Sequence, residues 1–140
     1  MKNSIQFLST FMILAFLFLS SCTTDNPAPS PADPRTSFAG TWSVSETWNK
    51  LSYEVTITTD PASSTGVYID NFAGAGIGVK THGTISGSSI YVAPSPQDLG
   101  NGWVIENGTG YLTGTTKINW GYVFNEGATQ YNATAVYTKK

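Results

Sequence analysis

The chain has 140 residues, a formal net charge of −2, only 11% charged residues and a single cysteine. Its only adjacent basic residues are Lys139 and Lys140, so it lacks the basic surface that nucleic-acid binding requires. A single cysteine also excludes an internal disulfide.

The N-terminal segment is apolar from Phe7 to Leu19, after a short polar start that contains Lys2. This run of about 13 residues is typical of a secretory signal and short for a membrane span. The sequence Leu19-Ser20-Ser21-Cys22 that ends it resembles the lipobox of bacterial lipoproteins, which implies cleavage before Cys22 and lipidation of that cysteine. There are two alternatives. Cys22 could be a free thiol beside an ordinary cleavage site, or the apolar run could be a transmembrane anchor.

We therefore predict a lipoprotein signal peptide over residues 1–21 and export to the cell envelope. Cys22 would anchor the protein in a membrane, and we expect this to be the outer membrane, on its periplasmic or surface face. Residues 22–36 contain four prolines after the cysteine, a composition that favours an extended spacer. The folded domain is then expected over residues 37–140.

That domain alternates apolar and polar residues nearly throughout, which is the pattern of half-buried strands. The sequence predicts about eight short strands, separated by Gly-, Asn-, Asp- and Pro-containing turns. They are expected at 38–48, 51–59, around Val67 and Ile69, at 77–85, around Ile90 and Val92, at 103–113, at 117–124 and at 129–138. A loop is expected between Pro94 and Gly102.

Eight short strands joined by tight turns indicate an all-β domain with a single antiparallel up-and-down sheet. Such a sheet removes its exposed edges by closing into a barrel. At this strand number the interior is filled by side chains or holds one small ligand.

The start of the domain, Phe38-Ala39-Gly40-Thr41-Trp42, resembles the F-x-G-x-W motif of lipocalins and other calycins. The domain as a whole is similar to the small calycin-like barrels found in lipoproteins of Gram-negative bacteria. The resemblance implies that Trp42 plugs one end of the barrel. Lipocalins usually place an arginine late in the chain against this tryptophan, whereas the single arginine here is Arg35. Avidins, which are also small G-x-W barrels, are a second family with this start.

Aromatic residues are the strongest chemical signal in the domain. We expect them either to fill the core or, in part, to line one open end and stack a flat, apolar or sugar ligand. Glu46 shares a face with Trp42 and Trp48, so it either points into the barrel or sits at its rim. The candidate ligand-binding residues are Trp42, Glu46, Tyr53, Trp103, Trp120 and Tyr122.

Few residues are suited to acid–base or metal chemistry. The single histidine, His82, lies by alternation on the face opposite Val79 and Ile85, where we expect it to be solvated. We expect no enzyme activity, no metal and no cofactor. The expected function is binding of a small hydrophobic or carbohydrate ligand, and the alternative is a filled barrel that binds a protein partner in the envelope. A cavity above about 300 Å³ containing Glu46 would favour the first hypothesis, whereas a filled interior would favour the second.

Overall fold

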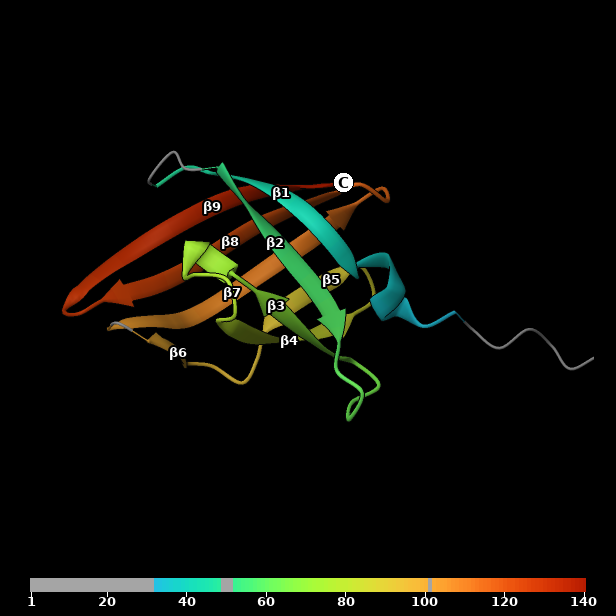
Figure 1. The fold of residues 1–140 in the computed structure, drawn as a ribbon, viewed down its shortest axis with the longest axis horizontal. Coiled ribbons are helices and arrows are strands. Elements are labelled where there is room, and N and C mark those ends of the chain that lie inside the picture. The colour runs from blue at the N-terminus through green and yellow to red at the C-terminus, as the bar shows by residue number, and fades with distance from the viewer. Residues whose placement is uncertain (1–31, 49–51, 101) are drawn as a thin grey trace, which may run out of the picture. The chain divides into compact units, whose positions relative to one another are not determined.

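A computed structural model describes residues 32–48, 52–100 and 102–140 of the chain. The predicted signal peptide, Cys22 and most of the predicted spacer lie outside the described residues. Within the described part the chain forms nine strands and two short 3-10 helices (Figure 1). The elements are η1 (Pro34–Ser37), β1 (Gly40–Glu46), β2 (Ser52–Thr59), β3 (Gly66–Asp70), η2 (Phe72–Gly74), β4 (Lys80–Ser86), β5 (Ser89–Val92), β6 (Gln97–Gly100), β7 (Trp103–Thr113), β8 (Lys117–Glu126) and β9 (Thr129–Lys139).

The strands form one closed antiparallel barrel. Their hydrogen-bonded order is β5-β4-β3-β2-β1-β9-β8-β7-β6, and β5 also pairs with β7. The β5–β7 pairing joins one end of the sheet to the strand next to its other end, so eight strands close the barrel and β6 lies outside the closure. The predicted fold class is confirmed.

Strand β6 corrects the prediction of a loop between Pro94 and Gly102. It pairs with the first residues of β7, whereas β5 pairs with the middle of the same strand. Because β7 is longer than β5, its first residues need another partner for their backbone groups. Pro94 and Pro96 separate β5 from β6 because proline has no N–H to give to a ladder.

The segment before β4 also differs from the prediction. Ile77 was expected in the strand, but β4 begins at Lys80 and Ile77 is 93% exposed. The flanking Gly76 and Gly78 have positive φ angles of 118° and 93°, which an extended strand does not accommodate.

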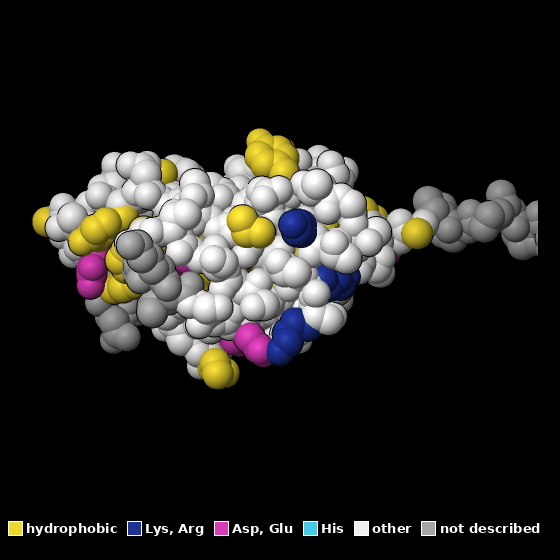
Figure 2. All heavy atoms as spheres, turned by 90° about the horizontal axis from the view of Figure 1, so that it is seen from above, with side chains coloured by type: hydrophobic (Ala, Val, Ile, Leu, Met, Phe, Trp, Pro, Cys, Tyr) yellow, Lys and Arg dark blue, Asp and Glu magenta, His cyan; other side chains and the backbone are white. Residues whose placement is uncertain are grey.

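Side chains alternate between the interior and the outer surface along most of the barrel, and a β-bulge between Ile105 and Asn107 interrupts the alternation on β7. On β8 the buried residues are Ile118, Trp120, Tyr122 and Phe124. The outer face of β1 and β9 instead carries mainly serine and threonine, and Figure 2 shows that few charged side chains lie on this side of the molecule. No helix in the described part of the chain is long and apolar enough to cross a bilayer.

The two ends of the barrel are built differently. Helix η1 and the start of β1 lie at one end, which we call the closed end. Helix η2 and β6 lie at the other, together with the end of β1 and the start of β7 (Figure 1). We call this second end the mouth.

Candidate functional site

Trp42 fills the closed end of the barrel. It is fully buried, and its indole Nε1 donates a hydrogen bond to the Phe38 carbonyl at 2.8 Å. The Lys139 ammonium lies 5.2 Å from the centre of the indole ring and donates to the Ser37 carbonyl at 3.1 Å. A lysine on the last strand therefore covers this tryptophan.

Replacing Lys139 with methionine is expected to lower the free energy of unfolding by about 1 kcal/mol, because the cation–π contact and one hydrogen bond are lost. Lys140→Met is the matched control. Lys140 pairs only with Glu54, and both side chains are more than half exposed, so this change should cost less than about 0.5 kcal/mol. Urea denaturation followed by tryptophan fluorescence measures both, and equal losses would contradict the role of Lys139.

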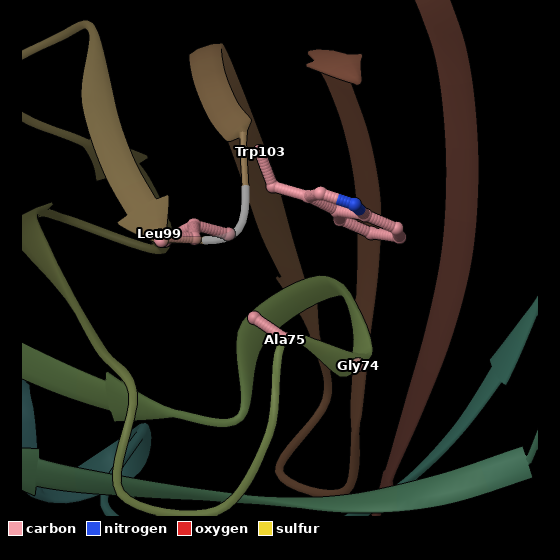
Figure 3. Close-up of a pocket in the computed structure, with 5 residues that line it drawn as sticks. Gly74, Ala75, Leu99 and Trp103 are labelled. Carbon is pink, nitrogen blue, oxygen red and sulfur yellow. The ribbon is translucent and has the colours of Figure 1, made fainter. Parts of the chain in front are cut away.

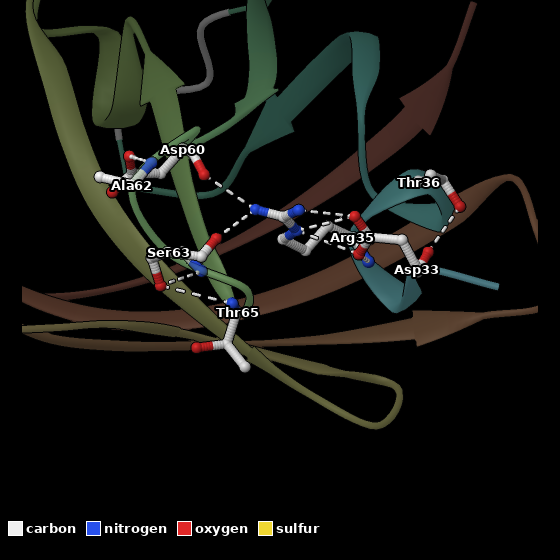
Figure 4. Close-up of polar contacts among 8 residues, drawn as sticks. Asp33, Arg35, Thr36, Asp60, Ala62, Ser63 and Thr65 are labelled. Carbon is white, nitrogen blue, oxygen red and sulfur yellow. Dashed lines mark hydrogen bonds and ion pairs between the residues drawn. The ribbon is translucent and has the colours of Figure 1, made fainter. Parts of the chain in front are cut away.

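At the closed end, Arg35 of η1 connects this helix to the turn between β2 and β3 (Figure 4). Its guanidinium donates to the carbonyls of Asp60 and Ser63 and forms an ion pair with Asp33. The hydrogen bonds from Arg35 hold the pKa of Asp33 below its usual range. Arg35 belongs to the segment predicted as spacer, so its long-range contacts with the β2–β3 turn could not be read from the sequence.

His82 is more enclosed than its position on the outer face suggested. Its side chain is 29% exposed, with Nδ1 2.5 Å from the Ala93 carbonyl and Nε2 3.2 Å from the Asp60 carboxylate. The hydrogen bond from the Ala62 N–H is the largest cause that lowers the pKa of Asp60, and the interaction with His82 lowers it further. The histidine thus links β4 to the β2–β3 turn and to the chain after β5. The described residues contain no group of three metal-ligating side chains.

Glu46 points into the barrel. It is only 3% exposed, and Tyr53 donates a hydrogen bond to its Oε1 at 3.0 Å. Burial is the main cause that raises the pKa values of Tyr53 and the fully buried Tyr137, and the Glu46 charge raises both further. Both hydroxyls therefore stay protonated beside a buried carboxyl group.

Four aromatic side chains meet inside the mouth, and we call them the mouth cluster: Trp48, Trp103, Phe124 and Tyr131. The Phe124 ring stacks on Trp103 at 5.2 Å and on Tyr131 at 5.0 Å between ring centroids. Trp48 covers Phe124 at 4.9 Å. Phe124 is fully buried, whereas the other three are partly exposed, so the cluster offers aromatic surface to the mouth.

A pocket of about 230 Å³ opens beside this cluster (Figure 3). Its described lining consists of Gly74, Ala75, Leu99, Gly100 and Trp103. The tryptophan supplies one aromatic wall, and small residues of η2 and the following turn supply the opposite side. The volume is below the range of about 300–1,000 Å³ that is typical for drug-sized ligands, so the pocket suits a small ring compound.

The six candidate ligand-binding residues fall into separate regions. Trp103 lines the mouth pocket. Trp42 lies at the closed end, and the other four, Glu46, Tyr53, Trp120 and Tyr122, lie inside the barrel. Sequence reasoning missed Gly74 and Ala75, because small residues in a break between strands carry no chemical signal of a binding wall. It also missed Leu99 and Gly100, because the short strand β6 was predicted as a loop.

Comparisons with known proteins support the fold alone. No family model matches the chain, and no curated protein sequence matches it. A redesigned β-barrel superposes with a TM-score of 0.50 at 18% identity, over 79% of this chain and 98% of the designed one. A candidate outer membrane protein of Bacteroides fragilis gives a TM-score of 0.48 at 15% identity, over 77% of this chain and 53% of that protein.

Proposed function

We propose that this protein is a lipid-anchored, non-enzymatic binding protein of the cell envelope that takes a small neutral ligand at the mouth of its barrel. A calycin-like relationship and an outer-membrane location, with the anchor at Cys22, are part of the proposal. The observation that carries it is the pocket beside Trp103, because an aromatic wall facing small residues is a common way to hold a flat hydrophobic or sugar ring. The polar outer face is consistent with a domain that stands in water and depends on its lipid for attachment.

The interior of the barrel is filled by side chains, which restricts the possible ligand sites to the mouth and the outer surface. Large aromatic side chains occupy the barrel, and Glu46 does not line the described part of the mouth pocket. The condition expected for a carrier, an internal cavity above about 300 Å³ with Glu46 inside, is therefore not met in the described structure. We place the ligand at the mouth for this reason.

Native mass spectrometry of the protein extracted from its own envelope tests the proposal. A mass excess that disappears on denaturation would reveal a bound small molecule. Trp103→Ala should weaken its binding about tenfold, because a stacking wall worth about 1.5 kcal/mol is lost. Tyr111→Ala removes an aromatic ring from the outer face of the same strand, where it is 57% exposed, and should leave binding unchanged.

The alternative function is a filled barrel that binds a protein partner. The filled interior favours it, and so do two exposed tyrosines, Tyr91 and Tyr111, on the outer face of the adjacent strands β5 and β7. In the same experiment, a mass shift equal to another subunit that is lost in Tyr111→Ala would support this alternative and overturn the mouth proposal. A bare protein mass would also count against the mouth proposal.

A further inference from the structure

One core aromatic residue does not come from a barrel strand. Phe72 belongs to the segment Asn71–Val79 between β3 and β4, which we call the plug segment. Its ring is fully buried and lies 5.0 Å from the ring centres of both Trp120 and Tyr122 on β8. The plug segment therefore fills, from the mouth side, a space that the barrel wall leaves open. We call the space that the Phe72 ring occupies the seat of Phe72.

The walls of this space carry polar atoms that Phe72 does not satisfy. Trp120 and Tyr122 are each 3% exposed, and neither the indole Nε1 nor the tyrosine hydroxyl has a hydrogen-bond partner among the described residues. Buried groups of this kind are normally hydrogen-bonded. A phenyl ring has no hydrogen-bond acceptor, so Phe72 fills the volume of its seat but leaves the polar groups of Trp120 and Tyr122 without a partner among the described residues.

The plug segment has two residues with left-handed backbone. Asn71, with a φ of 63°, is of a type that accepts this conformation readily, whereas Ala73, with a φ of 56°, is of a type that rarely adopts it. The ends of the segment are tied by the hydrogen bond from Asn71 N–H to the Val79 carbonyl at 3.0 Å and by that from Gly78 N–H to the Asp70 carboxylate at 3.0 Å.

The Asn71 side chain also donates to the Glu54 carbonyl at 2.8 Å and accepts from the Gly76 N–H at 2.8 Å. An opening movement that keeps β3 paired with β4 would therefore have to turn at the three glycines of the segment, Gly74, Gly76 and Gly78.

The plug segment also borders the mouth pocket. Gly74 and Ala75, two and three residues after Phe72, form one side of that pocket (Figure 3). Moving the segment away from the barrel would therefore extend the pocket toward the vacated Phe72 seat.

We propose that the plug segment is a displaceable lid, and that a ligand entering the mouth takes the seat of Phe72. This inference rests on the proposed function. The aromatic rings of Trp120 and Tyr122 border the seat, and each carries a buried uncharged polar group with no hydrogen-bond partner among the described residues. The ligand class is thus a neutral, flat ring compound that carries a hydrogen-bond acceptor such as an aryl ketone.

Acetophenone is a suitable probe, and ethylbenzene is a matched hydrocarbon without the acceptor. The full chain, labelled with ¹⁵N-tryptophan and held in lipid nanodiscs, gives separate indole N–H signals for Trp103 at the mouth and Trp120 at the seat. The Trp42 signal serves as a control, because its Nε1 already donates to Phe38. Assignments follow from the loss of one signal in each Trp→Phe variant.

Acetophenone is expected to move the Trp103 and Trp120 signals and to leave that of Trp42 in place, and ethylbenzene should bind several-fold more weakly. Phe72→Leu should raise the affinity for acetophenone by about tenfold, because the competing occupant fits its seat less well and the open state becomes more populated. Phe38→Leu, which alters an equally buried phenylalanine near the closed end, should not change it. An unchanged Trp42 signal shows that the barrel is folded in Phe72→Leu. In Phe38→Leu, where the substituted residue itself accepts from Trp42 Nε1, unchanged Trp103 and Trp120 signals in the absence of ligand show the same.

The outcomes separate this inference from the proposed function. If acetophenone moves only the Trp103 signal, the ligand stays at the mouth and the lid inference is wrong. Equal gains in affinity for Phe72→Leu and Phe38→Leu would also overturn it, because any core cavity would then have the same effect. If mass spectrometry reveals a native ligand but Trp103→Ala does not weaken the binding of that ligand, the proposed function at the mouth is wrong.

Discussion

Replacing Gly110 with alanine is expected to lower the free energy of unfolding by about 2–3 kcal/mol, because the barrel has no room for one more methyl group at this position. A Cβ atom on Gly110 would lie 2.7 Å from Ile90 Cγ2 and 2.7 Å from Trp120 Cε2. Ile90 and Trp120 belong to the strands on either side of β7. The indole of Trp120 would have to leave its position against the backbone of β7, and the closing β5–β7 pairing would be strained.

Gly121→Ala is the control for that substitution. Gly121 lies next to Trp120 on β8, but a Cβ atom there would meet nothing within 4 Å. Alanine should therefore be neutral, or stabilising by a few tenths of a kcal/mol, because it restricts the unfolded chain. Urea denaturation of both variants gives the comparison. Equal stability of the two would show that Trp120 is not packed against Gly110.

Raising the pH above about 10 is expected to destabilise the protein steeply, because Tyr53 and Tyr137 must keep their protons in the folded state. The pKa of each is raised in the barrel, first by burial. The unfolded chain loses both protons near the ordinary tyrosine pKa of about 10, whereas the folded chain retains them. Stability is therefore complete below that pH and falls by about 2.7 kcal/mol per pH unit above it.

The free energy of unfolding, measured between pH 8 and pH 12, checks this expectation together with the ultraviolet absorbance of tyrosinate. Tyr137→Phe should halve the part of the slope that the buried pair contributes. Glu46→Gln should lower the pKa of Tyr53 without restoring its usual value, because the carboxylate is the second cause of the shift and burial the first. If Tyr137→Phe left the alkaline slope unchanged, the buried tyrosine pair would not be responsible for it.

The mouth carries the functional argument, and its parts differ in how far they could be predicted. The inward position of Trp103 and Phe124 follows from alternation along β7 and β8. The wall opposite Trp103 does not, because Gly74 and Ala75 lie in a segment that alternation describes only as a break between strands. The presence of Phe72 in the core was missed for the same reason, since a single aromatic residue in a glycine-rich turn has no periodic signal.

The closed end gives a similar contrast. The F-x-G-x-W start suggested a plug at Trp42, and the structure buries that residue fully. The cation that covers it is Lys139, which comes 97 residues later and reaches Trp42 because β1 pairs with β9. The anchoring of η1 by Arg35 depends in the same way on the position of the β2–β3 turn.

By itself, the sequence determined that this is an all-β domain of about eight strands and which residues of most strands face inward. Both follow from a period of two, which is a local property of an extended chain. Only the tertiary structure decided that β5 and β6 share the edge of β7, that the plug segment enters the barrel, and that the pocket lies beside Trp103. These features depend on contacts between residues distant in sequence, where register, closure and the volume left by neighbouring side chains select one arrangement among many that the same local pattern allows.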